Sequence, residues 1–517
     1  MDKSETIIGK DVIELITLAM YEDSRFIYRE YIQNSADQID TAVEENVLRS
    51  LGDGKIEIDI NCTTKTISIF DNATGIKSSN VQSILKNVAQ STKDRSKHKG
   101  FRGIGRLGGL AYCSKLVFET SYTDEPIKSI LIWDSQKLKA IINNREKKEH
   151  AIAVIDDVTE FQTEAEDPKL HYFKVTLEGV TNEDLLNKEN IREYLSMVAP
   201  VAYNKGFIYK NEIYKKAKEI GYVIEEYPIF VNQDQVFKSY TSSIYKAENG
   251  NKSKIDEIYE IETYELRNVK NNLLAWGWYS ISRFEKVMPS INIARGIRLR
   301  KGNIQIGLED TSVKLFKEPR GSKYFFGEVF ITSNALLPNG RRDYFEENDE
   351  LRTFEKLIRR KFDELHKLYY FTSKVRNEKK RIDDFVAFTK EFEDKSNKGG
   401  FTNNDEKKKY QEKFESKKEK AIAAKEELKK LEQKTENDLT AQVKVFKKVV
   451  GEDIHKPEEV KINDNDNGKT KYITDDITKL NRKDRKLVSK ILSVIDSVLM
   501  KDLAENLKNK IIEELNK

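Results

Sequence analysis

The sequence has little cysteine and no long apolar run. Cys62 and Cys113 are its two cysteines, and they do not form a C-x-x-C pair. Their number excludes a disulfide framework and argues against a thiolate zinc site. A membrane-spanning helix needs about 18 consecutive apolar residues, and no stretch approaches that length. Because residues 1–24 also lack the apolar core and cleavage site of a signal peptide, we expect a cytoplasmic protein with no membrane partner.

An excess of charge of one sign is also absent. Lys and Arg together number 91 and Asp and Glu number 87, so the overall charge does not indicate a nucleic-acid partner. Charged residues nevertheless make up 34% of the chain, and 38% hydrophobic residues still suffice for buried cores. A chain of 517 residues is too long for a single core. These figures predict a globular protein of several domains with some extended helix.

Two regions of mixed composition make up the first part of the chain. Residues 1–185 alternate helical periodicity with strand-like segments such as KIEIDI (55–60), a pattern typical of an α/β sandwich. Residues 186–370 form a second mixed region, with strands such as LLAWGWYSI (273–281) and a helix from about Glu347 onward. We expect each region to be a separate packed domain.

The remaining residues have the pattern of charged helices. In residues 371–455, apolar positions recur at helical spacing on both sides of SNKGGFTNND (396–405), which predicts an antiparallel helical hairpin forming a coiled-coil arm. A single solvated helix is the alternative, because Lys417 and small alanines weaken the seam. Residues 456–517 combine a polar linker with an amphipathic helical tail that is too short to bury much surface alone, so we expect it to pack on another subunit or on the preceding domain. The predicted fold class is α+β, with two mixed domains, a hairpin and a helical tail.

Three polar side chains of REYIQNSADQID (29–40) share one face of a predicted helix. Glu30 and Asn34 are four residues apart and Asp37 follows by three, so all three point the same way at 3.6 residues per turn. An apolar stripe occupies the other side of the helix. Taken alone, the polar column is therefore also compatible with a solvated face.

A second motif, DNATGI (71–76), follows the predicted strand TISIF. Asp71 lies at the strand end and Gly75 follows, so the backbone can approach a planar ligand closely. The Asp71 carboxylate can then accept a hydrogen bond from an exocyclic amine of that ligand. A plain Asx turn is the alternative interpretation.

A glycine-rich, basic segment follows at STKDRSKHKGFRGIGRLGGLAYC. Gly100, Gly103 and Gly105 precede a predicted apolar helix (107–112), and lysines such as Lys93 add positive charge. Glycines before a helix N-terminus present N–H groups and the positive end of the helix dipole to phosphate oxygens. The segment is neither the dinucleotide fingerprint nor the P-loop, because the βαβ frame and the G-x-x-x-x-G-K-[ST] spacing are missing.

In their order and spacing, these motifs resemble those of the GHKL ATPases, the superfamily of gyrase B, heat-shock-protein-ninety chaperones, histidine kinases and MutL. The resemblance covers residues 1 to about 185 and implies a Bergerat nucleotide pocket. It is greatest for the heat-shock-ninety branch, in the segments YEDSRFIYREYIQNSADQ and GFRGIGRLGGLAYCSKLVFETS. LLPNGRRDYFEENDELRTFEKLIRRK is similar, less specifically, to the middle-domain (transducer-like) loop and helix that carry the catalytic arginine of those chaperones. Arg342 falls on that position.

The resemblance assigns roles to the polar column and to the arginine. Glu30 would be the general base that orients and deprotonates the attacking water. Asn34 would hold magnesium through its amide oxygen, and Asp37 would support the pocket. Arg342 would neutralise charge on the γ-phosphate, although its neighbour Arg341 leaves that assignment open by one residue. Phosphoryl transfer needs such positioning, a metal and cations, and little covalent chemistry from the protein.

The resemblance also assigns nucleotide contacts to the other two motifs. Asp71 would bind the adenine amine of ATP, directly and through a water shared with Thr176, and Gly75 would lie under the base. Ala73 replaces the first glycine of the family's D-x-G-x-G, so the backbone there must avoid positive φ. The phosphates would be wrapped by the backbone of Gly100, Gly103 and Gly105, with help from Lys93.

The activity implied is that of a magnesium-dependent ATPase. We expect a chaperone-like homodimeric clamp in which nucleotide-driven lid closure and N-terminal association act on a protein client. The alternative is a nucleic-acid clamp or effector ATPase of the MORC or MutL kind, for example in bacterial defence against phage, with KKEKAIAAKEELKK (417–430) touching phosphates. Alternating Lys and Glu in that segment favour a solvated arm, so nucleic acid is not the preferred partner. A histidine kinase is disfavoured, because no phospho-acceptor His lies on a dimerising helix upstream.

Overall fold

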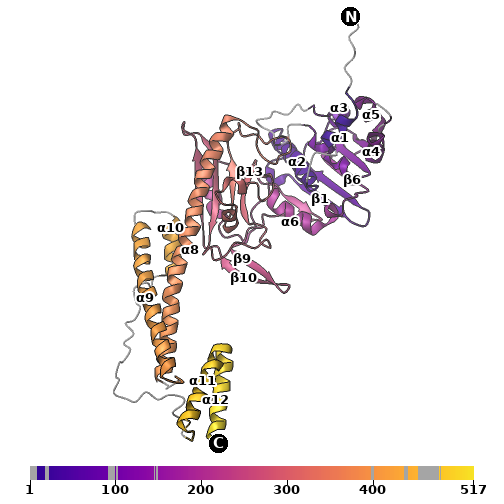
Figure 1. The fold of residues 1–517 in the computed structure, drawn as a ribbon. Coiled ribbons are helices and arrows are strands. Elements are labelled where there is room, and N and C mark those ends of the chain that lie inside the picture. The colour runs from indigo at the N-terminus through magenta and orange to yellow at the C-terminus, as the bar shows by residue number, and fades with distance from the viewer. Residues whose placement is uncertain are drawn as a thin grey trace. The chain divides into compact units, whose positions relative to one another are not determined.

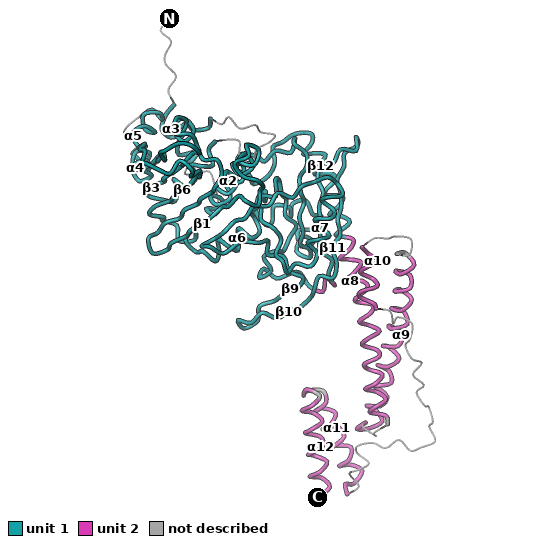
Figure 2. The backbone as a smooth tube through the Cα atoms, turned by 180° about the vertical axis from the view of Figure 1, so that it is seen from behind, with its two compact units in different colours: residues 1–282, 286–366 teal, residues 283–285, 367–517 magenta. Residues whose placement is uncertain are grey.

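The computed structural model describes most of the chain as two compact units. The residues described are 8–17, 23–90, 99, 103–144, 146, 149–397, 401–435, 441–451, 477 and 479–517. The first unit comprises residues 1–282 and 286–366, and the second comprises residues 283–285 and 367–517 (Figure 2). The first contains both sheets described below and the second is helical, which confirms the predicted α+β class (Figure 1).

An eight-stranded sheet, called the N-terminal sheet, has the strand order β5-β4-β3-β6-β2-β1-β7-β8. Its strands are β1 (Ile56–Asn61), β2 (Thr66–Asp71), β3 (Lys115–Ser121), β4 (Ile127–Asp134), β5 (Thr159–Ala165), β6 (Tyr172–Glu178), β7 (Ile229–Val231) and β8 (Asp234–Gln235). The β1–β7 pair is parallel and the other pairs are antiparallel. Strands β1 and β2 bury alternate residues, as expected for a sheet with one face covered by helices.

The helices of this part are short except for one. They are α1 (Asp11–Thr17), α2 (Phe26–Glu44), α3 (Ser78–Lys86), α4 (Ser135–Asn143), α5 (Ala151–Val158), α6 (Lys188–Val198) and α7 (Lys210–Glu219). Helix α2 packs on the sheet core through residues such as Ile32 and Ile39, and 13 of its 19 residues are buried.

The N-terminal sheet continues beyond residue 185, where the composition predicted a domain boundary. Strand β7 adds to it in parallel with β1, and Ile191 and Leu195 of α6 share a hydrophobic core with Ile56 of β1. A strand of three residues, such as β7, shows too little alternation to be recognised from the sequence.

A second sheet, called the middle sheet, has the order β11-β12-β15-β13-β14, and a separate hairpin pairs β9 with β10. The strands are β9 (Ser243–Glu248), β10 (Asn251–Glu257), β11 (Glu260–Arg267), β12 (Leu273–Ile281), β13 (Gly296–Lys301), β14 (Ile304–Ile306) and β15 (Phe326–Ile331). Strands β12, β13 and β15 are buried along almost their whole length. The sequences of β12 (LLAWGWYSI) and β15 (FGEVFI) are mostly apolar, as expected for strands covered on both faces, whereas β13 buries Arg298 and Arg300.

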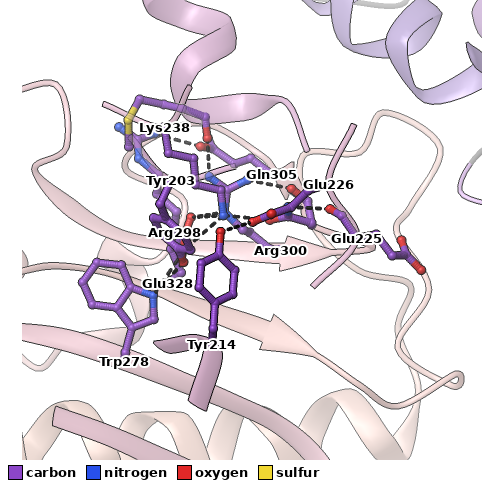
Figure 3. Close-up of polar contacts among 12 residues, drawn as sticks. Tyr203, Tyr214, Glu225, Glu226, Lys238, Trp278, Arg298, Arg300, Gln305 and Glu328 are labelled. Carbon is purple, nitrogen blue, oxygen red and sulfur yellow. Dashed lines mark hydrogen bonds and ion pairs between the residues drawn. The ribbon is translucent and has the colours of Figure 1, made fainter. Parts of the chain in front are cut away.

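Charged side chains are also buried against the middle sheet (Figure 3). Lys238, Arg300 and Glu328 are fully buried, and both cations form ion pairs with Glu328. Burial alone would raise the pKa of Glu328, but Arg300 and Lys238 outweigh it and lower the pKa to about 2. Removing one partner would leave a buried unpaired charge, so these three side chains hold one another in place.

The second unit is built from helices. They are α8 (Asp349–Asn397), which begins in the first unit, α9 (Asn404–Thr435), α10 (Ala441–Val450), α11 (Arg482–Val498) and α12 (Lys501–Asn516). Two ion pairs join α8 to α9: Lys374–Glu427 (2.5 Å) and Lys395–Glu406 (2.7 Å). From one pair to the next the residue number rises on α8 and falls on α9, so the predicted antiparallel hairpin is confirmed. A coiled-coil seam stays a prediction, and the predicted linker (462–476) lies outside the described residues. Within the described part of the chain, no helix is long and apolar enough to cross a membrane.

Candidate active site

The polar column of α2 lies inside the first unit. Glu30 is 7% exposed and Asp37 is 1% exposed, while Asn34 is half-buried. The other side of the helix packs into the core of the N-terminal sheet. A solvated face, the alternative for this column, is therefore excluded. Buried carboxylates must find partners, because an isolated charge away from water is costly.

Asp71 ends strand β2 and is oriented by two donors. The Ser35 hydroxyl of α2 donates to Oδ2 (2.7 Å), and the N–H of Ala73 donates to Oδ1 (3.2 Å). Asp71 is 1% exposed. These two donors hold the carboxylate of Asp71 in one orientation at the end of β2. Sequence reasoning missed Ser35, although it lies within the quoted helix.

The loop after Asp71 approaches the neighbouring strands closely. Gly75 has φ +69°, and an added Cβ would lie 1.9 Å from the carbonyl oxygen of Ser121. The N–H of Ile76 donates to Thr120 Oγ1 (2.9 Å). Ala73, which replaces the family's first glycine, is not among the residues with positive φ. Only glycine fits at position 75, whereas alanine is tolerated at position 73.

Thr176 lies on the opposite face of the sheet from Asp71. In the β2–β6 ladder, Asp71 pairs with Phe173 and Ser68 pairs with Thr176. Paired residues point to the same side and successive residues alternate, so side chains three positions apart point to opposite sides. The structure does not bring Thr176 to the carboxylate. Phe173 of β6 and its neighbour Thr120 of β3 lie on the Asp71 face instead.

The glycine loop is described in part. Gly103 and Gly105 are described, whereas Gly100 and Lys93 lie outside the described residues. Gly105 packs against the carboxylate of Glu30: an added Cβ would lie 2.3 Å from Oε2. A side chain at position 105 would therefore displace Glu30, and glycine allows the loop backbone to touch it.

The segment after the loop is a 3₁₀ helix, η2 (Gly105–Ala111), and not the α-helix expected at 107–112. Adjacent glycines, Gly108 and Gly109, disfavour an α-helix in so short a segment. Gly109 also allows close packing, because an added Cβ would lie 2.5 Å from the hydroxyl oxygen of Tyr31. Tyr31 donates from α2 to the carbonyl of Arg106 (3.0 Å), so η2 is held directly on the helix that carries Glu30.

Arg342 reaches Glu30 from the loop between β15 and α8. Its Nε lies 3.1 Å from Oε1 of Glu30, an ion pair without hydrogen-bond geometry, and its Nη2 donates to the carbonyl of Lys99 (2.5 Å). Arg342 is 9% exposed, whereas Arg341 is exposed to solvent. Of the two neighbouring arginines, Arg342 is the one that contacts the polar column.

A further arginine, missed in the sequence, joins α2 to the same loop. Arg29 is 1% exposed, and its Nη1 donates long hydrogen bonds (3.4 Å) to the carbonyls of Gln305 and Gly307. The N–H of Gly307 in turn donates to the carbonyl of Arg342 (2.8 Å). The strand end at β14 therefore connects the helix of Glu30 with the backbone of Arg342.

The donor set fits magnesium bound together with phosphates. Among the described residues, no group of three or more His, Cys, Asp or Glu side chains could hold a metal ion. Magnesium in nucleotide sites takes only one or two protein oxygens, and phosphates and waters supply the rest. The single amide oxygen of Asn34 is compatible with that arrangement.

Comparison with known proteins agrees with the sequence motifs. Residues 24–165 match the family of histidine kinase-, DNA gyrase B- and HSP90-like ATPases. The chaperone protein HtpG of Campylobacter jejuni subsp. doylei is 27% identical over 161 residues, which cover 28% of this chain and 26% of HtpG. HtpG of Buchnera aphidicola is 25% identical over 150 residues, covering 26% of this chain and 24% of HtpG. The matched segment thus spans about a quarter of the length of these relatives.

Proposed function

We propose that the GHKL ATPase domain formed by residues 24–165 binds and hydrolyses ATP, with Arg342 completing its active site. One observation carries the proposal. The carboxylate of Glu30 touches Gly105 through Oε2 and pairs with Arg342 through Oε1. A candidate base, a loop suited to phosphates and a cation therefore meet at one buried point. Phosphoryl transfer requires that combination of positioned base and positive charge.

At the adenine end, Asp71 accepts the exocyclic amine of the base. Ser35 and Ala73 hold the carboxylate in one orientation, so it need not reorganise when the ligand arrives. Gly75, without a side chain, lets the ring approach the loop backbone. Thr176 has no part in this contact, since it faces the other side of the sheet.

At the phosphate end, Glu30 orients the attacking water and accepts its proton. The backbone of Gly103 and Gly105 lies along the phosphates. The γ-phosphate competes with Glu30 for Arg342, which releases the carboxylate to act as a base and places the guanidinium against the developing charge. Magnesium bound through the amide oxygen of Asn34 would supply further positive charge at the phosphates.

The two arginines of the loop offer a matched test of this mechanism. Arg342→Ala should reduce kcat by about 100-fold or more, because a transition-state cation is removed, and should change ATP binding little. Arg341→Ala, its exposed neighbour, should turn over like the wild type. Phosphate release and ATP binding by calorimetry measure the two effects. Equal activity of both variants would contradict the assignment of Arg342.

For the whole chain, we propose a homodimeric, chaperone-like clamp that acts on a protein client. Helices α11 and α12 are joined by the ion pair of Lys508 and Asp496 (2.6 Å) but leave apolar side chains exposed. These side chains are Leu487, Ile491, Val494, Val498, Leu499, Met500, Leu503 and Leu507. An exposed apolar face on two short helices suits association with a second copy. Both HtpG relatives bear the name chaperone, which favours a protein client over nucleic acid.

Charge on that apolar face should separate the subunits. The double variant Val494→Glu, Val498→Glu buries two carboxylates in the proposed interface and should raise the dimer dissociation constant by about 100-fold or more. Lys490→Ala, on the same helix, is the control and should remain dimeric. Light scattering after size exclusion measures the mass. A monomeric wild type would refute the dimer and leave the ATPase proposal intact.

The nucleic-acid alternative has a distinct signature in solution. Binding of duplex DNA that falls steeply between low and physiological salt would support it, because phosphate contacts release counterions. Suppression of client aggregation that is insensitive to salt would support the chaperone-like clamp.

A further inference from the structure

Lys99, one of the lysines of the glycine-rich segment, is the centre of a charged cluster that the proposed mechanism does not use. Its side chain is 8% exposed. The ammonium lies 2.5 Å from Oδ2 of Asp40, 3.0 Å from Oε2 of Glu225 and 3.0 Å from the hydroxyl of Tyr227. The Tyr227 hydroxyl donates to Oδ1 of Asp40 (2.5 Å). We call these four residues the Lys99 cluster.

The Lys99 cluster joins the N-terminal sheet to the middle sheet. Asp40 belongs to α2, and Glu225 lies in the segment between α7 and β7. The carbonyl of Glu225 accepts a hydrogen bond from Nδ2 of Asn303 (2.7 Å), in the turn between β13 and β14. Oδ1 of Asn303 accepts a hydrogen bond from Lys238 (2.8 Å). Lys238 forms an ion pair with Glu328, and Glu225 lies beside these buried charged side chains (Figure 3). The cluster is thus anchored on the rigid interior of the middle sheet.

Electrostatics keep Lys99 charged in this position. Burial by itself lowers the pKa of the ammonium, but Glu225, Tyr227 and Asp40 outweigh it and the pKa is raised above its usual value. Gly302 packs against the side chain, since an added Cβ there would lie 3.0 Å from Cε of Lys99. The side chain is therefore held both by charge and by shape.

The backbone of Lys99 makes two contacts with the candidate active site. Its N–H donates to Oδ1 of Asp37 (2.7 Å), a member of the polar column. Its carbonyl accepts the hydrogen bond from Nη2 of Arg342 (2.5 Å). In the sequence, Lys99 is followed by Gly100, which has no side chain to anchor the backbone. Lys99 supplies a side-chain anchor directly beside that glycine.

We propose that Lys99 is a positioning residue for ATP hydrolysis: the ion pairs of its side chain fix its main chain so that the carbonyl directs Arg342 toward Glu30. The inference rests on the proposed ATPase function and adds Glu225, Asp40 and Tyr227 as the groups that hold Lys99. It follows that the charge of Lys99, held by residues outside the polar column, sets the geometry of the catalytic cation. A displacement of about 1 Å at such a cation is enough to slow the reaction strongly.

The test removes the charge and keeps the shape. Lys99→Met retains an unbranched side chain beside Gly302, and Glu225→Gln removes one partner at the more exposed side of the cluster. Each should lower kcat about tenfold and change the KM for ATP by less than about twofold. The double variant should be no slower than the slower single variant, because both changes break the same contact. Lys99→Arg should restore most of the activity.

A matched control separates positioning from loss of folding. Lys137→Met, on α4, breaks a surface ion pair with Asp157 of α5 (2.6 Å) and should leave kcat and KM unchanged. A merely structural role would lower the thermal midpoint of the Lys99 variants and change kcat and KM together. If the wild type hydrolyses ATP and both Lys99→Met and Glu225→Gln do so equally fast, the positioning role is refuted and the ATPase proposal stands. If the wild type does not hydrolyse ATP, both proposals fail.

Discussion

Glu30→Gln is expected to bind ATP and to hydrolyse it at least about 100-fold more slowly than the wild type, because general-base catalysis contributes roughly 10²–10⁴. Glutamine has nearly the same shape, so it still fits against Gly105, where an added Cβ would lie only 2.3 Å from the carboxylate. The neutral amide of glutamine cannot act as a general base. It also cannot form the ion pair with Arg342, whose Nε lies 3.1 Å from Oε1 of Glu30. The loss should therefore appear in kcat.

Two measurements define this result. Phosphate release under saturating ATP gives kcat, and calorimetric titration gives the dissociation constant for ATP, which should stay within about threefold of the wild-type value. Glu57→Gln, on strand β1 and paired with Lys55 at the surface, controls for the loss of one carboxylate. Turnover of Glu30→Gln at the wild-type rate would remove Glu30 from the mechanism, whatever the affinity for ATP.

Asp71→Asn is expected to weaken ATP binding strongly, at the adenine end of the nucleotide. The side chain is 1% exposed, and Ser35 and Ala73 donate to its two oxygens. An asparagine has one acceptor oxygen and one amide donor, so its NH₂ group must face either these donors or the adenine amine. A donor facing a donor in a buried site leaves both unsatisfied, which is costly. We expect ATP affinity to fall by about 100-fold, equivalent to about 2.7 kcal/mol.

The base specificity of the wild type provides an independent check on Asp71. GTP carries an oxygen where ATP carries the exocyclic amine, so the wild-type protein should bind GTP far more weakly than ATP. Asp71→Asn should lose that preference together with its affinity. Asp59→Asn, an exposed residue of strand β1, is the control and should bind ATP normally. ATP binding by Asp71→Asn with wild-type affinity would show that Asp71 does not contact the base.

The parts of the site that lie on a single element could be predicted from local spacing. Glu30, Asn34 and Asp37 occur on one helix, so a period of 3.6 residues is enough to align them, and α2 carries all three. Asp71 follows a strand with strong alternation, and β2 ends at that residue. Gly75 was recognisable because it occurs at a fixed distance from Asp71, and its φ of +69° explains why glycine is required.

Contacts between distant segments could not be predicted in the same way. Thr176 was placed by motif order, but a shift of one residue in strand register exchanges the two faces of a sheet, and its strand pairs Phe173 with Asp71. Arg29 is a motif neighbour, yet it binds a carbonyl 276 positions away. The importance of Lys99 depends likewise on partners that come together only in the folded chain. The predicted phosphate contacts of Gly100 and Lys93 stay predictions, since both lie outside the described residues.

The backbone of Arg342 has a consequence for how this protein responds to selection. Its φ of +56° lies in the left-handed region, where a residue with a β-carbon is strained by about 1 kcal/mol or more. Glycine at this position would relieve the strain, yet it would remove the cation next to Glu30 and leave that buried carboxylate without this ion pair. The strained backbone is therefore tolerated because of the charge that it carries to Glu30, and a screen that demands turnover would retain this arginine.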